Sequence, residues 1–334
     1  MKTAACIFLK VILIIVLMGG GIIAAFDQDK PQAVPQTAKK EVPRITFKNL
    51  SPPFTDYDYF QGHQEYPFQV KATSYNLINA WWLAEISTLV YADEDFVRAR
   101  FSKAGLLHVR FFDKQSTQCF VAHNDQIAIV AFRGSEIWKK QETFDLNKVI
   151  ADFKADVDIR LADWPPGGKV HRGFKDALEE VWSDLFPYIT QLDRKGCKLC
   201  FTGHSLGGAL ATIASIDLVD DVIAQGYARS ETVTYTFGAP RSMSEQMSNL
   251  HASLVPNTHA VVNPNDPVAH LPTAIGTSNP YSHVRNMAVL HAEDGTRTVR
   301  RNFGDGRDYG GCAHLIPDLL PITELGDHGR QEYN

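Results

Sequence analysis

One short segment constrains the fold of this chain more than any other, because an apolar stretch, a Gly-x-Ser-x-Gly pentapeptide and an Ala-rich stretch follow one another at 198–214. The first stretch has strand character, and the last favours a helix. A strand that turns directly into a helix at this motif is the context of a nucleophile elbow. Glycines at 203 and 207 leave room where such a turn crowds the backbone. The pattern predicts that Ser205 is exposed at the apex of the turn and acts as a nucleophile.

Segments with strand character alternate with segments of helical character along most of the chain. The alternation predicts an α/β fold with a mostly parallel sheet and helices on both faces. Active sites of such sheets form at the carboxyl ends of strands, and both Ser205 and Asp266 follow such ends. Trp81 and Trp82 are expected to be core anchors. The expected strands are 107–111, 119–122, 125–132, 198–202, 233–237 and 258–262, and the expected helices are 77–97, 170–188 and 209–214.

Five segments, in order, resemble motifs of the fungal-type (class 3) lipases, an α/β-hydrolase family. They are 129–135, which resembles the oxyanion loop, 169–174, which resembles the segment after the lid, the elbow GHSLGGAL at 203–210, the following strand at 236–241, and 263–272, which resembles the acid loop. The likeness extends from about Tyr75 to Tyr333. It implies an α/β-hydrolase fold with a lid segment, and ester hydrolysis through a Ser-Asp-His triad.

The predicted acid is Asp266, because it follows a strand and lies between Pro264 and Pro267, which stiffen the loop. An Asx-turn is the alternative role for this residue. The chain order of the triad, Ser then acid then His, supports Asp266. Asp294, Asp305 and Asp308 are the other candidate acids.

The predicted base lies near the C-terminus. His328, with a tyrosine five positions later, resembles the family's C-terminal catalytic loop, and His314 is the main alternative. His270, four residues after Asp266, is expected to shape the loop or the pocket wall. The remaining histidines after Asp266 are His283 and His291.

Two oxyanion donors are expected. One is the backbone N–H of Leu206, the residue after the nucleophile, and the resemblance places the other at Ser135. The interval between Ser135 and Val170 mixes large apolar and charged residues, and the resemblance implies a lid there, longer than the short fungal lid. A plain amphipathic surface helix is the alternative. His171 and His204 are expected to be structural.

The N-terminus predicts export. Lys2 and Lys10 precede an uncharged, mostly aliphatic stretch that ends in small residues suited to cleavage. We expect residues 1–26 to be a signal peptide, with an uncleaved membrane anchor as the alternative. Residues 27–55, rich in Pro, Gln and Lys, are expected to be a flexible arm, and 56–334 the lipase-like domain. The domain is then secreted or periplasmic, or membrane-associated if the leader stays.

Composition excludes other classes of function. A chain of 334 residues that is 44% hydrophobic can form one domain with a full core, and its net charge of −5, without basic clusters, makes nucleic acid an unsuitable partner. Cys197 and Cys200 form a CxxC in a strand, where residues three apart point to opposite faces about 10 Å apart, beyond disulfide reach. We expect buried thiols rather than a redox or zinc site. A disulfide that joins two of the mature cysteines stays open, and the sequence does not choose the pair.

The leading prediction is therefore a serine carboxylic-ester hydrolase that acts on lipid esters at a lipid interface, like a triacylglycerol lipase, and needs no cofactor or metal. A phospholipase A1-type or general esterase specificity is the alternative among enzymes. A non-catalytic lipase-fold binding protein at a membrane is the alternative of another class.

Overall fold

The computed structural model describes residues 58–134, 160–165, 167–224, 226, 231–262, 266, 268–272, 280–285, 287–293 and 296–302, the last two segments as backbone alone. The expected leader at 1–26 and the arm at 27–55 lie outside these residues. Among the helices described, none combines the length and the apolar character that a membrane crossing requires.

Eight strands form one central sheet in the order β1-β2-β3-β6-β7-β8-β9-β10. The strands from β3 to β9 run parallel, while β1 and β2 at one edge and β10 at the other are antiparallel to their neighbours. The mostly parallel sheet predicted from the alternation is thereby confirmed. The bounds are β1 His108–Asp113, β2 Gln118–His123, β3 Ile127–Phe132, β6 Lys198–His204, β7 Val233–Phe237, β8 Thr258–Val262, β9 Met287–Glu293 and β10 Thr296–Asn302.

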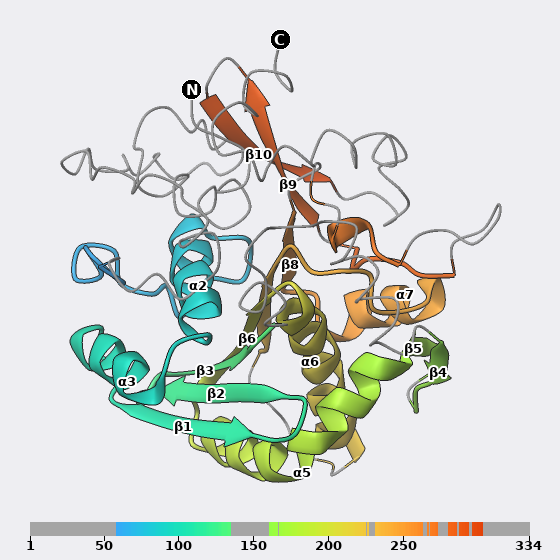
Figure 1. Cartoon of the computed structure of the whole chain (residues 1–334), viewed down its shortest axis with the longest axis horizontal. Helices are drawn as coiled ribbons and strands as arrows, with labels where there is room; N and C mark the ends of the chain where they lie inside the picture. Colours follow the sequence, from blue (N-terminus) through green and yellow to red (C-terminus); the bar gives the residue numbers. More distant parts are fainter. Residues whose placement is uncertain are drawn as a thin grey trace, which may run out of the picture.

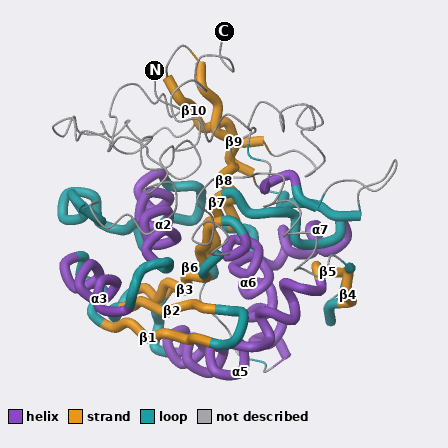
Figure 2. The backbone as a smooth tube through the Cα atoms, viewed as in Figure 1, coloured by secondary structure: helices purple, strands orange, loops and turns teal. Residues whose placement is uncertain are grey.

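Helices cover both faces of the sheet (Figure 1). On one face lie α2 (Leu77–Leu89) and α3 (Glu94–Lys103), and on the other lie α5 (Arg172–Arg194), α6 (Leu206–Ala224) and α7 (Glu245–Leu254), as the tube in Figure 2 also shows. Because strand side chains alternate between faces, Ile129 and Ala131 pack toward α2 whereas Val130 and Phe132 pack toward α6. The sheet is therefore buried between two apolar cores, and its carboxyl ends are held rigidly.

All three predicted helices have different bounds, and the one expected at 209–214 extends over Leu206–Ala224 as α6. The segment expected as one helix at 77–97 is two helices, α2 and α3, because Asp93 and the acidic residues Glu94 and Asp95 start a new helix after α2 ends. The segment expected as a helix at 170–188 begins with strand β5 (Lys169–His171), which pairs with β4 (Leu161–Asp163). Only five residues separate these two paired strands, and the helical spacing after 171 concealed the second one.

Several local predictions are confirmed. Trp81 and Trp82 are 2% and 3% exposed and belong to the core beneath α2. Cys119, Cys197 and Cys200 are buried, and no disulfide joins the two thiols of the CxxC at 197 and 200, as expected. Burial raises the pKa of the Cys200 thiol to about 12, so it stays protonated and unreactive at neutral pH.

Candidate active site

Ser205 occupies the turn between β6 and α6, as the elbow motif predicts. Its φ is +57°, a left-handed conformation that costs a residue with a side chain about 1–2 kcal/mol. The N–H of Ser205 donates to the carbonyl of Phe237 at the end of β7 (2.9 Å), and its own carbonyl accepts from the N–H of Gly208 (2.9 Å). These bonds hold the strained residue in place. Strain retained by surrounding structure is characteristic of functional positions.

The elbow requires glycines because a side chain at these positions would lie too close to neighbouring atoms. A Cβ built at Gly203 would lie 2.3 Å from the backbone of Gly207, and one at Gly207 would lie 2.1 Å from the carbonyl oxygen of Phe132 on β3. Gly208 lies similarly close to Ala239. The helix therefore packs directly on the strand ends, and its first N–H groups, beginning with that of Leu206, have no acceptor within the helix.

Asp266 lies in the loop after β8 and is only 5% exposed. One carboxylate oxygen, Oδ1, accepts the N–H of Val268 (2.9 Å), and the N–H of Ala269 also supports the carboxylate. Burial nevertheless raises the pKa of Asp266 well above its usual value. The other oxygen, Oδ2, is buried and has no hydrogen-bond partner among the residues that the structure describes. A buried carboxylate oxygen of this kind requires a donor, and an imidazole N–H would supply one.

Ser205 and Asp266 lie at the carboxyl ends of β6 and β8, and β7 separates these two strands. The N–H of Gly238, just after β7, donates to Val261 on β8 (2.9 Å), so the bonding continues beyond the regular ladder. Two strand spacings separate the nucleophile strand from the acid strand by about 10 Å. An imidazole with a hydrogen bond of about 2.8 Å at each ring nitrogen can span much of that gap.

The segment after β3 is the expected oxyanion loop. Gly134 lies against the hydroxyl of Tyr91 and the carbonyl of His204, because a Cβ built there would lie 2.2 Å and 2.8 Å from these oxygens. The Gly134 backbone hydrogen-bonds the Tyr91 hydroxyl, which is buried at the end of α2, and the Arg133 guanidinium lies 5.7 Å from the centre of the Tyr91 ring. Tyr91 therefore supports the loop immediately before Ser135. The sequence offered no signal for this role, because Tyr91 follows an apolar run like any core aromatic.

The structure thus brings some of the predicted site residues together and leaves others outside its described part. Ser205, Leu206 and Asp266 have the positions given above. Ser135, the rest of the expected lid up to 159, His314, His328 and the fallback acids Asp294, Asp305 and Asp308 lie outside the described residues.

The other histidines have different surroundings. His204 is buried, its Nδ1 lies 3.4 Å from the Tyr91 hydroxyl, and burial lowers its pKa to about 3. His171 is buried with its ring stacked on Phe174 at 4.0 Å. His270 ends the short 3-10 helix η4 (Val268–His270), and His283 contacts the backbone of this turn. His291 is on β9, where only the backbone is described.

Comparisons with known proteins agree with this arrangement. The family model for lipase (class 3) matches residues 129–275. A lipase from Rhizomucor miehei is 32% identical over 225 residues, which are 64% of this chain and 54% of that protein. A secreted mono- and diacylglycerol lipase 1 from Fusarium solani is 31% identical over 118 residues, 35% of this chain and 33% of that protein. The chain therefore spans about half, or less, of the length of these relatives.

A solved fungal lipase–inhibitor complex has the same fold, with a TM-score of 0.52 and 23% identity over 74% of this chain and 92% of that chain. The parallel sheet, the elbow at Ser205 and the buried acid after β8 define an α/β-hydrolase. Within that fold, residues 129–275 match the class 3 lipase family, and all five sequence motifs lie inside the matched residues.

Proposed function

We propose that this protein is a serine carboxylic-ester hydrolase that acts on lipid esters, in the manner of a triacylglycerol lipase. Ser205 attacks the ester carbonyl, His328 takes its proton as base, and Asp266 orients and stabilises the imidazolium. The N–H groups of Leu206 and Ser135 stabilise the oxyanion. His328 then protonates the leaving alcohol, and water releases the fatty acid from the acyl-enzyme.

The proposal depends on two features observed together. The nucleophile has a strained backbone conformation, and only one oxygen of the buried acid has a hydrogen-bond partner among the described residues. Ser205 has positive φ at a strand–helix turn, and Asp266 has one oxygen held by backbone N–H groups and one open among the described residues. A buried carboxylate that hydrogen-bonds one imidazolium ring orients that ring as the catalytic base. A binding protein would have no need of either feature.

The likeness to the family supports lipid esters as the substrate class and a lipid interface as the site of action. The interval between Ser135 and Val170 is proposed as a lid, so that lipid esters reach the site at an interface. Residues 1–26 are proposed as an export signal, 27–55 as the arm, and 56–334 as the enzyme domain, with the enzyme secreted like the Fusarium solani relative named above. An uncleaved leader would instead attach the enzyme to a membrane.

A labelling experiment tests the chemistry. A fluorophosphonate probe should modify the wild-type chain at Ser205, and Ser205→Ala should abolish both labelling and hydrolysis of p-nitrophenyl butyrate while its thermal unfolding stays cooperative. Absence of labelling in folded wild-type protein would contradict the proposal. Normal biological function of Ser205→Ala would favour the non-catalytic binding protein.

A substrate panel tests the specificity. Rates on triacylglycerol, phospholipid and short p-nitrophenyl esters should be highest on triacylglycerol, with a rise where the substrate aggregates. A preference for phospholipid would indicate the phospholipase A1 alternative. Smooth saturation across the aggregation point would contradict gating by a lid.

A further inference from the structure

The turn that follows Asp266 is fixed from outside by two residues, Arg241 and His283. The carbonyl oxygens of four consecutive residues, 269 to 272, each accept a hydrogen bond, and all four donors belong to Arg241 or His283. The same turn supplies the N–H groups that support the Asp266 carboxylate. Ala269 therefore bonds the catalytic acid through its N–H and the outer support through its carbonyl.

Arg241 makes three of these contacts. Its Nη1 donates to the carbonyls of His270 and Pro272 (3.1 Å for the second), and its backbone N–H donates to Leu271 (2.7 Å). The residue is 6% exposed, although its side chain carries a charge. A buried guanidinium that spans alternate carbonyls of one turn fixes both the position and the direction of that turn, because its donors have a rigid planar geometry.

His283 makes the fourth contact, from its Nε2 to the carbonyl of Ala269. A carbonyl can only accept, so Nε2 carries the proton and Nδ1 does not. Burial first, and then the Arg241 charge, lower the pKa of His283 to about 3, with His270 as a further nearby ring. The ring therefore remains neutral, with this tautomer, across the pH range in which an ester hydrolase works.

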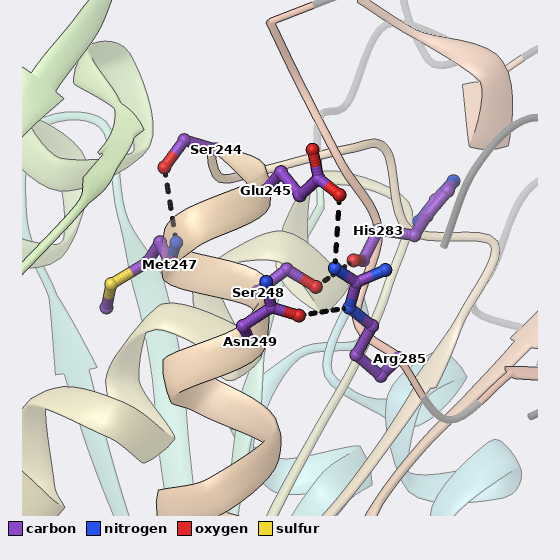
Figure 3. Close-up of polar contacts among 7 residues, drawn as sticks. All are labelled: Ser244, Glu245, Met247, Ser248, Asn249, His283 and Arg285. Atoms are coloured by element: carbon purple, nitrogen blue, oxygen red, sulfur yellow. Dashed lines mark hydrogen bonds and ion pairs between the residues drawn. The ribbon is translucent and has the colours of Figure 1, made fainter. Parts of the chain in front are cut away.

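Both donors are themselves anchored. Met243, two residues after Arg241, forms isolated bridges with Val170 of β5 and with Ser282. Figure 3 shows the next layer, in which Ser248 of α7 donates to the carbonyl of His283 (2.5 Å) and the His283 ring points away from that helix. The neighbouring Arg285 donates to Asn249 of α7 at 2.7 Å. The support thus runs from α7 and β5 to the acid loop.

We infer that Arg241 and His283 are positioning residues for the catalytic acid, which they hold in line with the base through the carbonyls of residues 269–272. This inference rests on the proposed function, because it concerns the orientation of Asp266 within the triad. Loss of either donor lets the turn shift, and a displacement of about 1 Å at a reacting group can reduce a rate about 100-fold.

The variants to compare are His283→Leu, which removes the donor, and His283→Gln, whose terminal amide can replace Nε2–H. Arg241→Lys keeps the charge but loses the planar fork. The matched control is His251→Leu, because His251 is equally buried in α7 but bonds Ser215, far in sequence from the acid loop. All are made in the full chain, with p-nitrophenyl butyrate as substrate.

We expect His283→Leu and Arg241→Lys to lower kcat about 10- to 100-fold with KM within about twofold, because binding of the ester is not disturbed. The acid limb of the kcat/KM profile should shift about half a pH unit lower, since a misaligned carboxylate stabilises the imidazolium less. His283→Gln should recover most of kcat and the original profile. His251→Leu should leave both unchanged, even if it unfolds at a lower temperature.

The outcomes separate the two claims. A folded wild-type chain that neither hydrolyses the ester nor reacts with a fluorophosphonate contradicts the proposed function. An active wild-type chain whose His283→Leu and Arg241→Lys variants keep kcat and the pH profile contradicts the positioning role alone. An equal loss in His251→Leu, or no recovery in His283→Gln, also overturns it, because a general loss of packing would then explain the data.

Discussion

Replacement of Asp217 by asparagine should stabilise the protein, and the gain should appear only as the pH rises. Asp217 lies on α6, against α5, and burial together with the nearby Asp221, Asp220 and Glu179 raises its pKa to about 7, while Lys175 opposes this. In the unfolded chain the pKa is 3.8. The folded state therefore favours the protonated form, so stability is full at low pH and is lost as the pH rises from about 4 through 7.

The magnitude follows from the difference between a pKa of about 7 and the ordinary value of 3.8, which is about 3 pKa units. At 1.36 kcal/mol per unit, the ionised carboxyl costs at most about 4 kcal/mol above pH 7, and about 2 kcal/mol once the partial exposure of the group is allowed for. Asp217→Asn should therefore raise the free energy of unfolding by about 2 kcal/mol at pH 8 and leave it unchanged at pH 4. In a domain of this size that corresponds to a rise in Tm of about 4–8 °C.

Urea denaturation at pH 4, 6 and 8, followed by tryptophan fluorescence, measures the effect as the difference between variant and wild type. Asp184→Asn is the control, because a hydrogen bond and ion pair with Lys114 (2.7 Å) lower the pKa of this exposed carboxyl. It should show no gain at pH 8. A gain for Asp217→Asn that is the same at all three pH values would refute the reasoning, because it would reflect helix propensity or packing rather than ionisation.

Two further changes probe the site and the core. Tyr91→Phe removes the hydroxyl that Gly134 bonds, so the oxyanion loop loses a support. The kcat on p-nitrophenyl butyrate should therefore fall about 10-fold with little change in KM. A proportional rise in KM with constant kcat would contradict this. Burial lowers the pKa of His251 to about 4. Between about pH 6.5 and 4 the unfolded chain therefore binds a proton at this ring and the folded chain does not, so stability is lost as the pH falls through this range. His251→Gln should reduce that slope by about 1.4 kcal/mol per pH unit in denaturation experiments, and an unchanged slope would argue against a neutral buried ring.

The elbow could be predicted from the sequence because its cause is local. Gly203 and Gly207 are needed within five residues of Ser205, and the strand before and the helix after lie next to them. Strands β7 and β8 were predicted with their correct bounds for the same reason, since each is a short apolar run between turns. The mostly parallel sheet could also be predicted, because these strands alternate with helices along the chain.

What the sequence did not reveal depends on partners far along the chain. The break between α2 and α3 lies in an apolar run that continues the helical spacing, so only the acidic start at Asp93 marked it. Tyr91, just after α2, contacts Gly134, just after β3. Arg241 and His283, which precede and follow α7 in the sequence, both contact the acid loop. His283 was counted among the candidate bases only because it follows Asp266. No periodicity connects such pairs, so contacts of this kind become visible only in three dimensions.

The end of β7 sets the distance that a base between Ser205 and Asp266 has to span. Phe237 accepts the N–H of Ser205, and Gly238 donates to β8, so β7 sets the spacing between the nucleophile and the acid strand. Gly238 has φ +56° and no side chain, and Ala239 follows it with a single methyl group. The Oδ2 of Asp266, which has no hydrogen-bond partner among the described residues, would pair with a ring that another segment supplies.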